Sequence, residues 1–342
     1  MVIYTQNSKF LLQNFKDLNV LVTGGAGFIG SETVIQLLQA GAYVTVLDNF
    51  SSGKTHYLPK KQKYLKIIKG DIRDEKIVDR SIKDQTAVIH LAALPFIPDS
   101  YYHPADFFNV NTIGSINMLW NSIRSKSVEV FIQISTSEVY GSAQFVPMDE
   151  NHPTAPHSTY AVSKLAGDRA AFTLHKENGF PVVVIRPFNS YGPRYTEPYI
   201  IPEIITQIVR GSKELNLGNV HASRDFTYVE DTTRAILKSI IEKKAIGEII
   251  NVGSGTEISI RDLVKKIAKI SKKKIKIKYD ESRERPYDVN RLVCNNKKAK
   301  EILKWEPKTS IDKGLVLTYR WALKNRVVFK APFKRWYYKN EK

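Results

Sequence analysis

The sequence has a single cysteine, Cys294, among its 342 residues. One cysteine cannot form an intramolecular disulfide, and no Cys/His cluster has zinc spacing, so we expect neither a disulfide framework nor a bound metal. No apolar stretch approaches the roughly 20 residues that a membrane helix needs. Residues 1–15 also lack the basic start and the long apolar run of a secretory signal. We therefore expect a cytoplasmic protein with no membrane partner.

Acidic residues are outnumbered: 34 Asp and Glu stand against 52 Lys and Arg, for a formal charge of +18. Such an excess raises the question of nucleic-acid binding. The lysines are spread along the chain, with short runs at 60–63 and 272–276, and no nucleic-acid motif accompanies them. We expect solvated faces and a basic cleft for small anions, and no nucleic-acid partner. The sequence predicts no particular function for an N-terminal extension at 1–17 or for a basic, aromatic tail at 330–342.

The first recognisable unit is a strand, a turn, a helix and a second strand. An apolar run at 19–22 predicts a strand, and it leads into a glycine-rich turn at 23–30. An amphipathic stretch at 31–39 predicts a helix, and the run at 43–47 predicts a second strand. This succession is the βαβ order in which dinucleotides are commonly bound.

Four residues of this unit predict the ligand. Gly24, Gly27 and Gly30 allow a tight turn and a close approach of a pyrophosphate, and the helix that starts there directs free N–H groups at the phosphates. Asp48 lies 18 residues after Gly30, at the end of the second strand. Its carboxylate can accept hydrogen bonds from ribose hydroxyls and would repel a 2′-phosphate. The predicted cofactor is therefore NAD rather than NADP.

Strand and helix patterns continue to alternate, which predicts an α/β fold with a Rossmann-like, doubly wound parallel sheet. We expect an NAD-binding domain at 18–189 and a smaller C-terminal α/β substrate-binding lobe over most of 190–329, from which segments can return to the first domain. The expected strands lie at 64–68, 87–93, 128–134 and 181–185, and the expected helices at 105–124, 160–176, 201–210, 258–270 and 310–324.

Polar residues gather where the strand at 128–134 ends. Thr136, Ser137 and Glu138 follow this strand, at the sheet edge where ligands of such folds collect. Tyr160 and Lys164 are four residues apart, so they share one face of a helix. A free tyrosine, with a pKa of about 10, is a poor base at neutral pH. We expect the Lys164 ammonium and the nicotinium charge of the cofactor to lower the pKa of Tyr160 together.

These features resemble the extended short-chain dehydrogenase/reductase family, from about residue 19 to about residue 323. The resemblance implies that Thr136 hydrogen-bonds the 4-hydroxyl of a sugar, that Tyr160 is the base and that Lys164 holds the cofactor ribose. It implies a homodimer that pairs through the helices at 105–124 and 160–176. It also implies cofactor contacts from Gly24, Gly27, Phe28, Ile29, Gly30, Asp48, Asn49, Asp71, Ile72, Leu91, Ala92, Ala93, Asn111, Tyr160 and Lys164. Asn111 has a second interpretation, as an amide that packs its helix.

Within that family, the triplet 136–138 resembles the nucleotide-sugar 4,6-dehydratases, such as GDP-mannose dehydratases. These enzymes oxidise C4, which acidifies the hydrogen at C5; Glu138 would remove it as a general base, and Ser137 would assist loss of the C6 hydroxyl. Dehydratases acting on dTDP-glucose usually carry aspartate where Ser137 stands, so the general acid stays open. The segments 98–101 and 140–147 resemble dehydratases of N-acetylglucosamine nucleotides in bacterial nonulosonic-acid pathways.

The predicted activity is therefore that of an NAD-dependent nucleotide-sugar 4,6-dehydratase, a lyase that forms a 4-keto-6-deoxy sugar from a nucleotide-bound N-acetylglucosamine or glucose. UDP-glucuronate decarboxylases, which also carry a Thr-Ser-Glu triplet, are the main alternative, and sugar-nucleotide 4-epimerases follow. By the same resemblance, Asn189 and Arg224 bind the substrate diphosphate, and Arg285 contacts the diphosphate or the ribose. Arginine suits this task because its planar fork pairs with phosphate oxygens, although surface salt bridges remain an alternative for both arginines.

Overall fold

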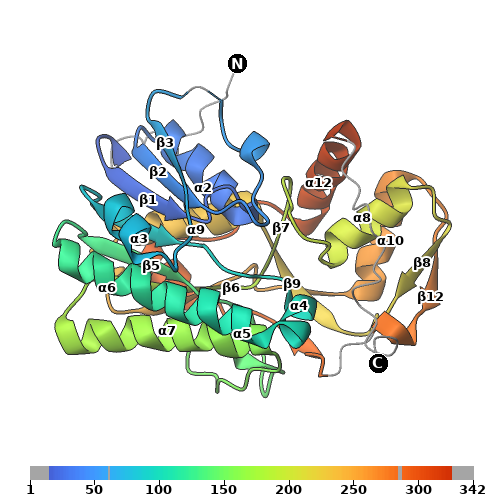
Figure 1. The fold of residues 1–342 in the computed structure, drawn as a ribbon. Coiled ribbons are helices and arrows are strands. Elements are labelled where there is room, and N and C mark those ends of the chain that lie inside the picture. Colours follow the sequence, from blue (N-terminus) through green and yellow to red (C-terminus); the bar gives the residue numbers. More distant parts are fainter. Residues whose placement is uncertain (1–14, 61, 284–286, 326–342) are drawn as a thin grey trace.

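The structure is a computed structural model that describes residues 15–60, 62–283 and 287–325 (Figure 1). Arg285, the tail at 330–342 and most of the N-terminal extension therefore lie outside the described residues.

A seven-stranded sheet, with all neighbours parallel, forms the larger part of the protein. Its strands alternate their side chains between two buried faces: Val20 and Val22 join one core, while Leu21 joins the other. The order across the sheet is β10 (Ile249–Val252), β6 (Val182–Pro187), β5 (Val130–Ile134), β4 (Ala87–His90), β1 (Asn19–Thr23), β2 (Tyr43–Asp48) and β3 (Leu65–Lys69).

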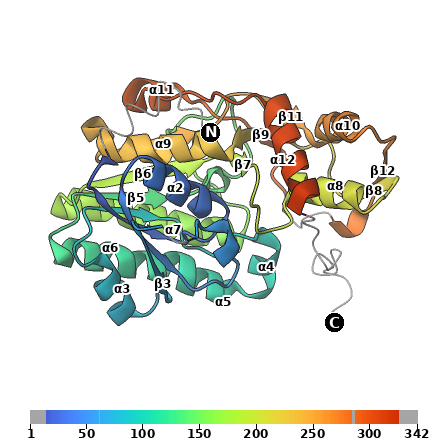
Figure 2. The ribbon, with the colours of Figure 1, turned by 90° about the horizontal axis from the view of Figure 1, so that it is seen from above.

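Helices cover both faces of this sheet (Figures 1 and 2). One face carries α2 (Phe28–Gln39), α9 (Val229–Ile241) and α11 (Lys297–Leu303), and the other carries α3 (Glu75–Ile82), α6 (Ser115–Ser125) and α7 (Thr159–Asn178). The predicted Rossmann-like, doubly wound sheet is confirmed. Strand β10 and helix α9 were not predicted; they lie in the large layer although they fall within 190–329.

The helix expected at 105–124 is divided. It consists of α5 (Pro104–Phe107), a π-helical segment η2 (Phe108–Gly114) and α6. A short helix, α4 (Ile97–Tyr102), precedes it after the loop that follows β4. The wide π turn carries Asn111, whose side chain is buried. The remaining short turns are η1 (Thr55–Tyr57), η3 (Ser137–Tyr140), η4 (Lys243–Ala245) and η5 (Glu281–Arg283).

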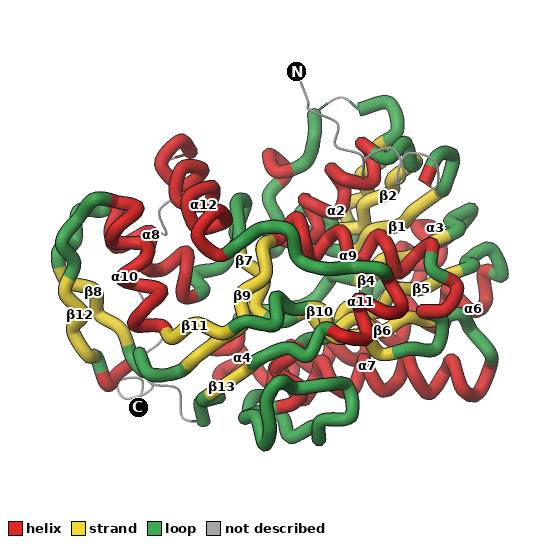
Figure 3. The backbone as a smooth tube through the Cα atoms, turned by 180° about the vertical axis from the view of Figure 1, so that it is seen from behind, coloured by secondary structure: helices red, strands yellow, loops and turns green. Residues whose placement is uncertain are grey.

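A smaller lobe has its own apolar core and two small sheets (Figure 3). One sheet has the order β11-β9-β13 with β7 paired to β9, and the other pairs β12 with β8. The strands are β7 (Asn189–Tyr191), β8 (Glu214–Leu217), β9 (Ser223–Tyr228), β11 (Glu257–Ser259), β12 (Lys276–Tyr279) and β13 (Arg291–Leu292), and the helices are α8 (Ile200–Val209), α10 (Ile260–Ser271) and α12 (Ile311–Asn325). Within the described ranges, no helix is both long and apolar enough to cross a bilayer.

Candidate active site

A cavity of about 610 Å³ runs along the carboxyl ends of the large sheet and into the smaller lobe. Its walls come from the loops after β1, β2, β3, β4 and β5, from α7, and from β7, α8 and β9. Apart from Asn111 and Arg285, every site residue predicted from the sequence lines this cavity. The described residues contain no cluster of three or more His, Cys, Asp or Glu side chains suited to a metal.

The glycine-rich turn is shaped by close backbone contacts. Gly24 has φ +66°, and a Cβ on Gly30 would lie 2.0 Å from the Gly24 carbonyl oxygen, so neither position accommodates a side chain. Gly27 caps α2 without a side-chain hydrogen bond, so no side chain occupies the cap of the helix at the cavity wall. This open helix end, with its positive dipole, fits the diphosphate of a dinucleotide.

Asp48 is fixed at the end of β2 by two backbone hydrogen bonds. Its Oδ2 accepts from the Ala26 N–H at 2.9 Å and its Oδ1 from the Phe50 N–H at 2.7 Å. Burial nevertheless raises the pKa of this carboxyl above its ordinary value. Each oxygen keeps a second lone pair, so the carboxylate can still accept a ribose hydroxyl.

Asp71 is engaged by a residue that was not predicted. Arg73 donates from Nε and Nη2 to the Asp71 carboxylate, both at 2.9 Å, and Asn49 Nδ2 donates to it at 3.0 Å. The guanidinium holds the pKa of Asp71 well below its usual range. Arg73 also lines the cavity, but the sequence offered no motif that separates it from other surface arginines.

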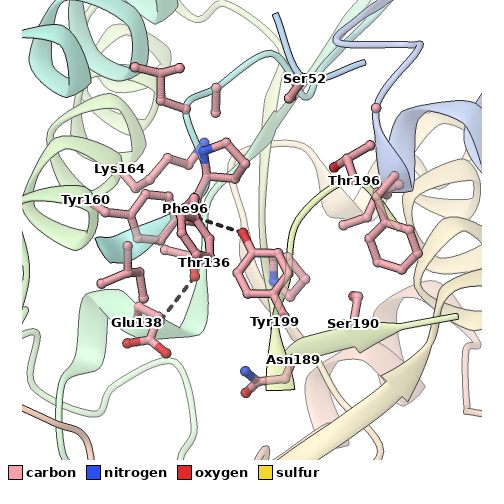
Figure 4. A pocket seen from close by; sticks show the side chains of 18 of the residues that line it. Ser52, Phe96, Thr136, Glu138, Tyr160, Lys164, Asn189, Ser190, Thr196 and Tyr199 are labelled. Atoms are coloured by element: carbon pink, nitrogen blue, oxygen red, sulfur yellow. Dashed lines mark hydrogen bonds between the residues drawn. The ribbon is translucent and has the colours of Figure 1, made fainter. Parts of the chain in front are cut away.

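The polar triplet lies in the single turn η3 directly after β5. Thr136 caps this turn, because its Oγ1 accepts from the Glu138 N–H at 3.2 Å. Figure 4 shows Thr136, Glu138 and Tyr160 on one side of the cavity, with Asn189 and Tyr199 on the other. The short turn brings the carboxyl group of Glu138 close enough to Tyr160 to raise the pKa of the phenol.

Tyr160 and Lys164 both line the cavity from α7, and burial shifts the pKa of each in the protein alone. Burial raises the pKa of Tyr160 to about 12, rather than lowering it. Burial also lowers the pKa of Lys164 to about 8, and its Nζ donates to the Ile134 carbonyl at 2.5 Å. In the protein alone, desolvation of the phenol is the largest effect on its pKa, followed by the hydrogen bond with Thr136, which lowers it. The expected lowering, which includes the nicotinium charge of NAD, stays a prediction for the protein with its cofactor bound.

Asn111 does not line the cavity. Its Oδ1 accepts from the Leu94 N–H at 2.8 Å, and its Nδ2 donates to the Leu94 carbonyl at 3.1 Å and to Ser163 Oγ at 3.0 Å. It is 1% exposed. The amide ties the loop after β4 to α7, which agrees with its packing interpretation, and the implied cofactor contact stays a prediction.

The residues predicted to bind the substrate come from the smaller lobe. Asn189 lines the cavity, and its buried Oδ1 has no hydrogen-bond partner among the described residues. Arg224 lines it as well, and donates to the Ser223 carbonyl at 2.9 Å and to Asp288 at 3.4 Å. Tyr199, which was not predicted, crosses to the opposite wall, where its hydroxyl donates to the Pro95 carbonyl at 2.8 Å (Figure 4).

Residues 21–318 match the sequence profile of the GDP-mannose 4,6-dehydratase family. The chain belongs to this family. Among its relatives, a dTDP-glucose 4,6-dehydratase of Streptomyces niveus is 33% identical, with 90% of this chain and 94% of the relative aligned. A UDP-N-acetyl-alpha-D-glucosaminuronate decarboxylase of Bacillus cytotoxicus is 31% identical, over 88% and 96% of the two chains.

Solved structures of the same family agree with this assignment. An epimerase of Methanothermobacter thermautotrophicus superposes with a TM-score of 0.88, at 31% identity and over 94% and 96% of the two chains. The dTDP-glucose 4,6-dehydratase of Streptomyces venezuelae, solved with NAD bound, gives 0.84 at 31% identity, over 90% and 98%. The chain is therefore an enzyme of the nucleotide-sugar dehydratase, epimerase and decarboxylase superfamily, and NAD is the cofactor bound in its relatives.

Proposed function

We propose that this enzyme is an NAD-dependent nucleotide-sugar 4,6-dehydratase. It removes one water from a nucleotide-bound hexose, such as a glucose or an N-acetylglucosamine, and releases a 4-keto-6-deoxy sugar nucleotide. One observation carries the proposal: Glu138 offers a carboxylate in the same cavity as Tyr160, near enough to influence its pKa. A plain 4-epimerase needs no general base at this position.

The cavity fits NAD through the open N-terminus of α2 and through Asp48. The helix end would hold the diphosphate, and Asp48 would accept the ribose hydroxyls and disfavour a 2′-phosphate. When bound, NAD supplies oxidation at C4 and the matching reduction at C6, so that it is regenerated in each turnover.

Tyr160, Thr136 and Lys164 act on C4. Thr136 orients the 4-hydroxyl, and Tyr160 takes its proton as the general base. Because the pKa of Tyr160 is about 12 in the protein alone, the phenol needs a nearby positive charge before it can do so. The nicotinium ring of NAD would add that charge, beside the ammonium of Lys164 one helical turn away.

Glu138 and Ser137 act on C5 and C6. The C4 ketone acidifies the C5 hydrogen, and the Glu138 carboxylate removes it as a proton. The electron pair left at C5 expels the C6 hydroxyl, which departs as water with assistance from Ser137 or from a water that it holds. The double bond formed between C5 and C6 is then reduced, as the hydride would return to C6 and a proton would be taken up at C5. Asn189 and Arg224 would hold the diphosphate, which fixes the sugar between these groups.

The experiment is a panel of nucleotide sugars incubated with the purified protein and NAD, followed by mass spectrometry. GDP-mannose, dTDP-glucose, UDP-glucose, UDP-N-acetylglucosamine and UDP-glucuronate cover the dehydratase, epimerase and decarboxylase reactions. The proposal expects the loss of one water from one hexose. If carbon dioxide is released from UDP-glucuronate without dehydration, the enzyme is a decarboxylase. If only the stereochemistry of a sugar changes, it is an epimerase.

A further inference from the structure

A buried ion pair lies in the part of the cavity wall that the smaller lobe supplies. Glu203, on α8, and Arg283, in η5, are joined through Glu203 Oε1 and Arg283 Nη1, and both line the cavity. Their side chains are only 8% and 9% exposed. Burying two charges costs free energy even when they are paired, so an ion pair that faces a ligand cavity suggests a role in binding. None of the steps described above uses it.

Glu203 is held beside the end of β8. Gln207, one turn further along α8, donates to Glu203 Oε1 at 3.2 Å and accepts from the backbone N–H of Asn216 at 3.2 Å. Asp280, which also pairs with the arginine, donates its backbone N–H to the Leu217 carbonyl at 2.9 Å. Since Leu217 itself lines the cavity, the carboxylate lies next to an apolar part of the wall.

The carboxylate keeps one oxygen for a ligand. Both hydrogen bonds that it accepts within the described residues end on Oε1. Oε2 is not among the fully buried side-chain oxygens that lack a partner, and Glu203 lines the cavity. Burial raises the pKa of Glu203 to about 7, which the Arg283 guanidinium opposes. The smaller lobe also supplies apolar side chains to the cavity wall, among them Ile201, which precedes Glu203 by two residues, Leu217 and Ile260.

The position of Glu203 along the cavity limits what it can contact. With the sugar at Tyr160 and its diphosphate at Asn189 and Arg224, the nucleoside extends further into the smaller lobe. A carboxylate oxygen among apolar side chains suits a flat base with an N–H group. We propose that Glu203 Oε2 accepts a hydrogen bond from the ring N–H of the substrate's nucleobase.

This inference rests on the nucleotide-sugar function proposed above, but not on the choice between dehydratase, epimerase and decarboxylase. It selects uracil, thymine and guanine, which carry a ring N–H on their pairing edge, over cytosine and adenine, which do not. A site that offers a buried acceptor discriminates strongly against a ligand without the matching donor, because the acceptor is then left unpaired.

The test is calorimetric binding of UDP, dTDP, GDP, CDP and inorganic pyrophosphate to the wild type and to Glu203→Gln. We expect the tightest of the first three ligands to lose roughly ten-fold or more in affinity in the variant, as for a hydrogen bond to a charged group. Pyrophosphate and NAD binding should stay unchanged. Glu230→Gln, on α9 and outside the cavity wall, is the control and should leave every affinity unchanged.

A second measurement needs no variant. N3-methyl-UDP, or N1-methyl-GDP if GDP binds best, lacks the ring N–H and should bind the wild type as weakly as the parent ligand binds Glu203→Gln. The assignment would be overturned if the wild type bound the methylated ligand as tightly as the parent ligand. It would also be overturned if Glu203→Gln lost as much affinity for pyrophosphate as for the nucleotide, or if its loss of affinity depended on whether the ligand carries ribose or 2′-deoxyribose. If the wild type binds no nucleoside diphosphate at all, the nucleotide-sugar function itself fails.

Discussion

Arg186 and Asp168 form an ion pair with two hydrogen bonds in the interior, between β6 and α7. Arg186 donates from Nε to Asp168 Oδ2 at 2.8 Å and from Nη2 to Oδ1 at 3.1 Å, and the two side chains are 2% and 0% exposed. Arg186 Nη1 also donates to the Tyr140 hydroxyl at 3.0 Å. Tyr140 ends the turn that carries Glu138, so this pair connects that turn to the helix of Tyr160.

Replacing Asp168 should therefore destabilise the fold. In Asp168→Asn the Arg186 guanidinium is left buried without a countercharge, and such a loss typically costs about 3–5 kcal/mol. Urea unfolding monitored by circular dichroism measures this difference. Asp262→Asn, which removes an exposed carboxylate on α10, is the control and should change the free energy of unfolding by less than about 1 kcal/mol. Equal effects of the two substitutions would contradict the assigned role.

Lys164→Met should abolish turnover and yet stabilise the protein without cofactor. The folded-state pKa of about 8 lies below the ordinary value of 10.5, so the buried ammonium costs stability below pH 8, and the cost disappears as the pH rises to 10.5. Removing the buried ammonium should raise the free energy of unfolding by about 3 kcal/mol, the size of this pKa shift. The loss of the hydrogen bond to the Ile134 carbonyl reduces this gain by about 1 kcal/mol.

Thermal or urea unfolding at pH 7 and at pH 10 shows whether the substitution stabilises or destabilises the protein. We expect the free energy of unfolding of Lys164→Met to exceed that of the wild type by about 2 kcal/mol at pH 7, and by less at pH 10. Lys66→Met, on an exposed position of β3, should show no such dependence. A variant that is less stable than the wild type at pH 7 would show that the ammonium is not penalised by burial.

Glu138→Gln should separate the two halves of the proposed reaction. The amide cannot take the C5 proton, so the rate of dehydration should fall by about a hundred-fold or more, the size of a lost general base. Exchange of the C5 hydrogen with deuterated solvent should vanish, while oxidation at C4, which depends on Tyr160, continues. Dehydration at the wild-type rate would remove Glu138 from the mechanism. Glu150→Gln, at a half-buried glutamate that does not line the cavity, is the matched control.

A homodimer should form through α6, α7 and the π-helical segment. Large apolar side chains are exposed on this surface: Ile113 is 50% exposed, Trp120 48% and Val162 39%. Such a patch is uncommon on a monomer. Light scattering after size-exclusion chromatography should give twice the monomer mass for the wild type and a lower mass for Trp120→Asp. Ile246→Asp, at an exposed apolar position outside these helices, should leave the dimer intact.

The identification of the site residues depended on spacing, which is local. The glycines of the turn, Asp48 and the Tyr160–Lys164 pair are each placed by one strand end or one helix face, so their common cavity followed from the rule that parallel strands end at one edge. Strand β10 was not predicted, because three apolar residues and one asparagine far along the chain carry no sign of the sheet that they join.

The sequence by itself determined the Rossmann-like sheet, the dinucleotide turn and the residues that face the catalytic part of the cavity, because periodicity and glycine placement act over a few neighbouring residues. Only the tertiary structure decided that Asn111 ties the loop after β4 to α7, that burial raises the pKa of Tyr160, and that Glu203 pairs with Arg283 in the cavity wall. Desolvation and ion pairing depend on groups brought together from distant parts of the chain, and no local pattern encodes them.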